Sequence, residues 1–277
     1  MNYQNLFKKV IDDRTSGSLA LLDMTVSILK NHVSEEFEIN AMQLKSSIND
    51  IKKKQPDFPA LHHFLDFIIG CLHDFPKQGE TTLKSYLLKN IENYEAEWKD
   101  APTRASRNLL KTVNMNNKTI LLHSNSNTII ELFSLLSSDK TQATIYQTSS
   151  EPLKEGKIQA MKLSELGFEV HFIQEASCSR FIKYIDFAIF GADAIFKNAF
   201  INKSGSFQLA LLFKFFNKPV YVIADARKKK PLITDNNILN ENERDVAEIW
   251  GNAPQKVKIH NYYFELIPNE LVDRFFL

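Results

Sequence analysis

Residues 186–191 read DFAIFG, a short run of apolar and aromatic side chains with the length and composition of a buried strand. Four more runs of this kind lie in the second half of the chain, at residues 119–124, 143–148, 169–173 and 219–224. Stretches with helical spacing separate them, at residues 129–136, 157–166, 178–184 and 207–216. This alternation predicts an α/β domain with a Rossmann-like, mainly parallel, doubly wound sheet and helices on both of its faces.

The first part of the chain has a different pattern. Apolar residues recur at helical spacing through residues 19–29, 39–54, 61–72 and 80–99, and prolines fall at the breaks between these stretches. We therefore expect an all-helical N-terminal domain over residues 1–112, followed by the Rossmann-like domain over residues 113–277. The polar, Asn-rich segment 228–252 is expected to leave the sheet.

The composition is that of an ordinary globular protein, with 44% hydrophobic and 24% charged residues. A net charge of +1 gives no bulk field that would favour direct binding to nucleic acid or a membrane surface. No apolar run approaches the roughly 18 residues that a membrane helix needs. The two cysteines, Cys71 and Cys178, match neither a disulfide framework nor a metal site, so we expect a reducing, cytoplasmic location and no bound metal or cofactor.

Polar residues follow the predicted strands at their carboxyl ends, where open parallel sheets bind ligands. Residues Ser124 to Thr128 follow the first strand, and such a Ser/Asn run can hold an oxyanion or simply cap the next helix. Asp193 follows the strand at 186–191 through Gly191, and it reads as a general base or as an ordinary turn residue.

Two basic segments lie near these strand ends. Asn202 and Lys203 precede a Ser-Gly turn and a helix start, which suits a phosphate ligand but also fits a solvated loop. The run of three lysines at residues 228–230 is interpreted as a solvated loop, because short basic runs usually are.

Five segments together resemble one known family. They are Leu122–Ser126, Glu155–Lys157, Gly191–Ile195, Asn202–Gly205 and Phe264–Val272. Their order is similar to that of the alpha, beta and delta regulatory subunits of eukaryotic translation initiation factor 2B, a family that includes methylthioribose-1-phosphate isomerase and ribose-1,5-bisphosphate isomerase. The resemblance covers nearly the whole chain. It implies a helical domain on a Rossmann-like domain, a homodimer formed through the latter, and a phosphosugar ligand.

The resemblance also implies roles for single residues. In the family's isomerases, a Cys after the first strand and the Asp of Gly-Ala-Asp act as a pair on a ring-opened aldose phosphate. Asp193 matches that Asp, and Ser124 stands in place of the Cys. The remaining ligand-binding positions that the resemblance implies are Ser16, Gly17, Asn125, Ser126, Asn202 and Lys203. Ser16 and Gly17 match an Arg-Gly-Ala turn whose Arg is missing here, with Arg14 as a candidate substitute.

Two departures from the family pattern shape the expected function. A Ser hydroxyl gives up its proton far less readily than a Cys thiol. Glu151 also replaces an Arg of the family's Glu-Ser-Arg-Pro motif, so it would repel a phosphate unless its side chain points away. We therefore expect a non-catalytic, regulatory protein that binds a sugar phosphate or a nucleotide monophosphate.

Two alternatives stay open. One is an aldose–ketose isomerase acting on a ribose phosphate, with Asp193 as the base, Ser124 as a hydroxyl donor and Lys203 as the anchor. The other is a subunit of a guanine-nucleotide exchange assembly, whose partners would be related subunits.

Overall fold

The computed structural model describes residues 7–13, 18–56, 58–78, 82–229 and 243–277. The chain divides into two compact units, Met1–Asp100 and Ala101–Leu277. This division comes earlier than residue 112, because helix α7 (Ala101–Leu110) buries Ala105 and Leu109 in the core of the second unit. Among the described residues, no helix is long and apolar enough to cross a membrane.

The first unit is helical, as the spacing of its apolar residues predicts. Its described helices are α2 (Lys8–Asp12), α3 (Ser18–Glu35), α4 (Ala41–Lys54), α5 (Pro59–Gln78) and α6 (Leu83–Trp98). Asn40 caps α4 by accepting a hydrogen bond from the Gln43 amide at 3.1 Å. Leu44, Ile48 and Ile51 recur on one face of α4 and are fully buried in the single core of this unit.

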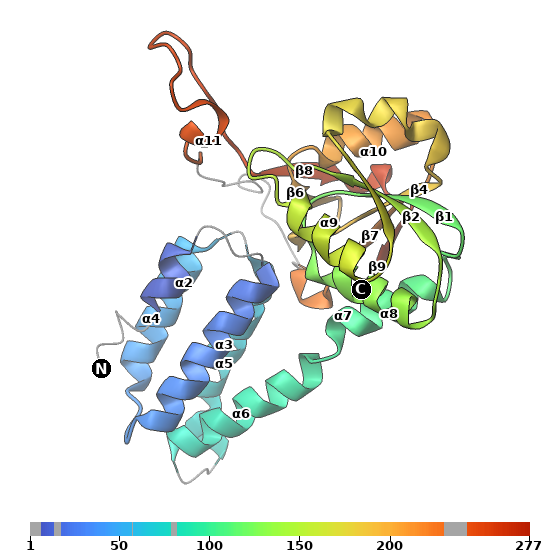
Figure 1. Ribbon diagram of the computed structural model, residues 1–277. Helices are drawn as coiled ribbons and strands as arrows, with labels where there is room; N and C mark the ends of the chain where they lie inside the picture. The colour runs from blue at the N-terminus through green and yellow to red at the C-terminus, as the bar shows by residue number, and fades with distance from the viewer. Residues whose placement is uncertain (1–6, 14–17, 57, 79–81, 230–242) are drawn as a thin grey trace. The chain divides into compact units, whose positions relative to one another are not determined.

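The second unit contains a six-stranded parallel sheet in the order β3-β2-β1-β4-β7-β9 (Figure 1). The strands are β1 (Lys118–Leu122), β2 (Ala143–Thr148), β3 (Glu169–Ile173), β4 (Phe187–Phe190), β7 (Val220–Ile223) and β9 (Arg274–Phe276). Helices α8 (Asn127–Ser138), α9 (Gly156–Glu165) and α10 (Ser206–Phe215) connect the strands. This architecture confirms the predicted fold class, and it adds the short strand β9 near the end of the chain.

The strand order reverses between β1 and β4, which pair directly and in parallel. In an open parallel sheet, the crevice beyond the carboxyl ends of two such strands is the usual ligand site. Residues after β1 and β4 therefore lie at the position where a ligand is expected.

A small antiparallel sheet of β5 (Ala194–Ile195), β6 (Ala199–Lys203) and β8 (Phe264–Pro268) was not predicted. Asn202 and Lys203 therefore lie on a buried strand rather than in a loop, paired with Glu265 and Phe264 of β8. The predicted helix over 178–184 is likewise replaced by two 3₁₀ helices, η1 (Glu175–Arg180) and η2 (Ile182–Tyr184). Three further short elements are η3 (Ala226–Lys228), α11 (Ala247–Trp250) and η4 (Asn269–Leu271).

Candidate functional site

A carboxylate joins two of the predicted site residues at the carboxyl end of β1. Ser124 donates a hydrogen bond from its hydroxyl to Glu155 Oε1 at 2.7 Å. The other carboxylate oxygen of Glu155 lies 3.1 Å from the Lys203 ammonium. The structure thus brings Ser124 and Lys203 together through Glu155, which the sequence analysis did not place in the site.

The backbone fixes these side chains in strained or crowded positions. Ser124 has a φ of +69°, in the left-handed region that is costly for a residue with a side chain. Gly156, directly after Glu155, begins α9 so close to β2 that a Cβ there would lie 1.9 Å from the Thr148 carbonyl oxygen. The position of Glu155 therefore depends on a glycine at its neighbour.

Lys203 is only 1% exposed, which is costly for an ammonium unless it is paired. Glu155 supplies the countercharge, and the ring of Tyr263 lies with its centroid 4.5 Å from the ammonium. The lysine is therefore part of a built cluster, and the solvated-loop interpretation of this segment is wrong.

His123 is fully buried and contacts two other segments of the site, at Thr148 and Ser204. Its Nδ1 is 2.6 Å from the Thr148 hydroxyl, and its Nε2 is 3.1 Å from the Ser204 carbonyl oxygen. Since a carbonyl only accepts, Nε2 carries the proton and Nδ1 accepts from Thr148. Burial lowers the pKa of His123 below its usual value, although the Glu175 carboxylate, 3.7 Å away, opposes this shift.

The loop after β2 closes over Ser124 from one side. The Ser124 amide donates to the Ser150 hydroxyl at 2.8 Å, and the Ser150 amide donates to Glu175 Oε1. Glu151, at the position of the family's Arg, has a half-exposed side chain that lies 3.8 Å from Lys154. Its charge is therefore screened by solvent and by a lysine.

Asp193 forms a second charged pair, with a residue that sequence analysis missed. Lys228 donates to the Ala192 carbonyl oxygen at 2.6 Å, and its ammonium lies 3.9 Å from Asp193 Oδ1. Lys228 is buried, so its assignment to a solvated loop is wrong, whereas Lys229 is exposed. Asp225 begins the turn that carries Lys228, because it caps η3 and binds the Arg227 guanidinium through both of its oxygens, at 2.9 and 2.6 Å.

The other predicted binding residues lie around this end of the sheet. Asn202 donates from Nδ2 to the Ser206 hydroxyl at 2.9 Å, and the Ser126 amide donates to Gln159 at 2.8 Å. A Cβ on Gly191 would lie 3.1 Å from the Ser126 hydroxyl, so the backbone after β4 lies close to the loop after β1. Asn125 has a buried Oδ1 for which the structure gives no hydrogen-bond donor.

Three predicted residues cannot be placed. Ser16, Gly17 and the candidate substitute Arg14 lie outside the residues that the structure describes. Their role as ligand-binding residues stays a prediction.

The helix N-termini at this end of the sheet differ in what they offer an anion. The N-terminus of α10 already holds the Glu265 carboxylate, which accepts from the Phe207 amide at 2.6 Å and whose pKa burial raises. At α8, the N-cap Ser126 makes no side-chain capping bond to the first-turn amides. The start of α8 is therefore the better position for an anionic group of a ligand.

The two cysteines supply no reactive thiol to this site. Burial raises the pKa of Cys178 to about 12 and that of Cys71 to about 11. Both thiols are free and buried.

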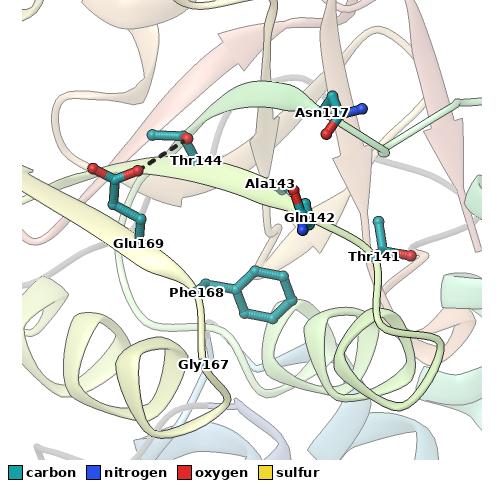
Figure 2. A pocket seen from close by; sticks show the side chains of 8 residues that line it. All are labelled: Asn117, Thr141, Gln142, Ala143, Thr144, Gly167, Phe168 and Glu169. Atoms are coloured by element: carbon teal, nitrogen blue, oxygen red, sulfur yellow. Dashed lines mark hydrogen bonds between the residues drawn. The ribbon is translucent and has the colours of Figure 1, made fainter.

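A groove of about 470 Å³ lies at the opposite edge of the sheet, where β1, β2 and β3 begin (Figure 2). It is lined by Asn117, Thr141, Gln142, Ala143, Thr144, Gly167, Phe168 and Glu169. The Thr144 hydroxyl donates to Glu169 across it at 3.4 Å. The predicted site residues do not line this groove, so it is separate from the candidate site.

Comparison with known proteins places this geometry in context. The model of the initiation factor 2 subunit family matches residues 13–276. Ribose 1,5-bisphosphate isomerase of Archaeoglobus fulgidus is 30% identical over 161 residues, which are 56% of this chain and 50% of that protein. Translation initiation factor eIF2B subunit alpha of Dictyostelium discoideum is 26% identical over 233 residues, covering 80% of this chain and 71% of that protein.

The match to the curated isomerases is partial, since the chain spans about half of their length. Among solved structures, the translation initiation factor eIF-2B of Pyrococcus horikoshii OT3 superposes with a TM-score of 0.81 at 22% identity, covering 99% of this chain and 94% of that one. At this identity, the superposition supports the fold and leaves the activity to be argued from the site.

Proposed function

The chain belongs to the initiation factor 2 subunit family, and from this premise we propose that it binds a small phosphorylated ligand, a sugar phosphate or a nucleotide monophosphate, without isomerising it. The ligand lies beyond the carboxyl ends of β1 and β4. Its anionic group meets the start of α8 and the Lys203 ammonium, and its hydroxyls meet Asn125, Asn202 and Asp193.

The hydrogen bond from Ser124 to Glu155 is the observation that carries the non-catalytic part of the proposal. An isomerase working through this position needs a group that gives up and regains a proton. A carboxylate 2.7 Å from the hydroxyl makes loss of that proton harder still, because it would place two negative charges side by side. Ser124 is therefore a hydrogen-bonding residue.

Charge pairing supports modest rather than tight binding. The three buried cations described at this end of the sheet are each matched by an acid: Lys203 by Glu155, Lys228 by Asp193, and Arg227 by Asp225. A phosphate must therefore compete with Glu155 for Lys203. Such competition suits a regulatory role, in which the occupancy of the site changes with the concentration of the ligand.

A thermal-shift and calorimetric titration with ribose 5-phosphate, ribose 1,5-bisphosphate and AMP tests the proposal. A bound ligand at 100 times its Kd stabilises the fold by about 2.7 kcal/mol, so the melting temperature rises with ligand concentration. Product analysis by NMR should show unchanged sugar phosphate. Enzyme-like conversion of an aldose phosphate to a ketose phosphate would overturn the proposal.

The second candidate function is an aldose–ketose isomerase. It is favoured by the Asp193–Lys228 pair, a carboxylate beside a cation at the switch point of the sheet, and by the isomerase names among the relatives. In this reading Asp193 is the general base. An Asp193→Asn variant that retained full turnover would exclude it.

Self-association through the second unit is part of the proposal, either as a homodimer or with related subunits of an exchange assembly. Phe207, Leu211 and Phe215 recur every fourth residue along α10, with 36%, 44% and 79% of each side chain exposed. Such an apolar stripe is typical of an interface. Light scattering should show a dimer that Phe215→Glu converts to monomer, while Lys214→Glu, beside the stripe, serves as the control.

A further inference from the structure

Residues 243–263, here called the arm, extend away from strands β6 and β8 and carry the short helix α11 (Figure 1). Val246, Ile249 and Trp250 of the arm are 41%, 51% and 51% exposed. The arm contributes no residue to the proposed ligand contacts. Its last residue, Tyr263, nevertheless touches the site.

Tyr263 contacts the site and the arm at the same time. Its ring lies 4.5 Å from the Lys203 ammonium, and its backbone carbonyl accepts from the Ser204 amide at 2.8 Å. Its hydroxyl donates to the Glu248 carboxylate of α11 at 2.6 Å. One buried side chain therefore joins the ammonium of the site to the helix of the arm.

Further contacts join the residues at the base of the arm to one another. Asn261 donates from Nδ2 to Glu248 Oε2 at 2.8 Å and to the Asp245 carbonyl oxygen at 2.7 Å. The Arg244 amide donates to the Asn261 carbonyl oxygen at 2.8 Å, and the Arg244 guanidinium lies 5.0 Å from the Tyr263 ring. Several contacts therefore link Tyr263 to α11 at the base of the arm.

We propose that Tyr263 is a positioning residue that couples the arm to the candidate site. Lys203 shares its charge between the Glu155 carboxylate and the Tyr263 ring. An anionic ligand that draws the ammonium to itself weakens the contact with the ring, and the Tyr263–Glu248 hydrogen bond passes the change to α11. By reciprocity, the state of the arm sets the affinity of the site. This inference rests on the proposed function for its ligand.

Trp250 provides the measurement, since it is one of only two tryptophans in the chain. In a Trp98→Phe background, the emission and acrylamide quenching of Trp250 report on the arm alone. Addition of ribose 5-phosphate should shift both in the otherwise unchanged protein. Tyr263→Phe keeps the ring but loses the bond to Glu248, so it should abolish the shift and weaken affinity by about fivefold, the lower end of typical coupling. Tyr262→Phe, the exposed neighbour, is the matched control and should behave like the parent.

The outcomes separate the coupling from the proposed function. If calorimetry shows binding but Trp250 does not respond, or if Tyr263→Phe binds as tightly as Tyr262→Phe, the coupling is wrong while the proposed function stands. If no phosphorylated ligand binds, the proposed function fails, and the ligand-free Lys203→Met variant then decides the coupling. An unchanged quenching constant for Trp250 in that variant overturns it, and a changed one supports it.

Discussion

Two acid–base pairs lie at the same end of the sheet, and they differ in how closed they are. Glu155 is held by two short contacts, 2.7 Å to the Ser124 hydroxyl and 3.1 Å to the Lys203 ammonium. Asp193 has a looser pair, 3.9 Å from the Lys228 ammonium, and its side chain is 20% exposed. The carboxylate that would act as a base is thus partly exposed, whereas the hydroxyl that would exchange a proton already donates to a carboxylate.

This difference separates binding from catalysis among residues at one end of the sheet. A partly exposed carboxylate at the switch point can accept hydrogen bonds from the hydroxyl groups of a polyol. The Ser124 hydroxyl, by contrast, already donates its proton to the Glu155 carboxylate, so it is suited to hold Glu155 in place and not to exchange a proton with a substrate.

Lys203→Met should have the largest effect. It removes the buried cation of the tighter pair and leaves Glu155 without its partner, so affinity for ribose 5-phosphate should fall by about 100-fold. Calorimetry measures the affinity, and circular dichroism confirms that the variant is folded. Lys229→Met, which removes an exposed charge nearby, should bind like the parent. Binding that survives Lys203→Met unchanged would place the anion elsewhere.

Glu155→Gln should strengthen binding. The amide oxygen still accepts from Ser124, but the negative charge that competes for Lys203 is gone, so affinity should rise by about tenfold. The control is Glu151→Gln, whose half-exposed side chain should change affinity by less than about twofold. A weaker affinity in Glu155→Gln would show that Glu155 contacts the ligand itself.

Acid should destabilise the fold through His123. Because burial lowers the pKa of His123 in the fold, the unfolded chain binds the proton more readily. The stability from the neutral imidazole is complete above a pH of about 6.5 and is lost as the pH falls below it, by at most about 1.4 kcal/mol per pH unit.

Urea unfolding between pH 7 and pH 5 measures this slope. His123→Gln, whose amide can keep both hydrogen bonds, should flatten the slope. His32 in the first unit also has a pKa lowered by burial, so part of the slope should remain. An identical slope in His123→Gln would mean that His123 does not titrate in this range.

Asp193→Asn should have the smallest effect on binding. Its ion pair is long and partly solvated, so affinity for ribose 5-phosphate should change by less than about threefold. The same variant examines the alternative function, because an isomerase that relied on Asp193 would lose its turnover. NMR product analysis of the parent and Asp193→Asn side by side distinguishes the two functions.

The parallel sheet could be predicted because its strands have a recognisable composition in the local sequence. Each of the five predicted strands is a short run rich in β-branched and aromatic residues. Four of them are largely buried, as their composition predicts, whereas the edge strand β3 is mostly exposed. The places of Ser124 and Asp193 followed directly, since both come immediately after such strands.

The rest of the site depends on contacts between distant segments. Strand β6 is buried because it pairs with β8, more than fifty residues later in the chain, and no local pattern announces that pairing. Lys228 is buried because it reaches the Ala192 carbonyl oxygen in the link between β4 and β5, although two further lysines follow it in the sequence. Glu155 entered the sequence analysis only within the segment Glu155–Lys157 of the family resemblance. Its role could not be predicted, because its partners Ser124 and Lys203 come from other parts of the chain.

Gly156 sets a limit on how such a pocket can diverge. Any side chain at this position would collide with the Thr148 carbonyl oxygen and push α9 off the sheet, so the spacing between helix and strand is closed to substitution. Its neighbour Glu155 meets no such steric limit, but a residue in its place would still have to pair the buried Lys203 ammonium. Two adjacent positions are therefore restricted for different reasons, residue 156 by space and residue 155 by charge.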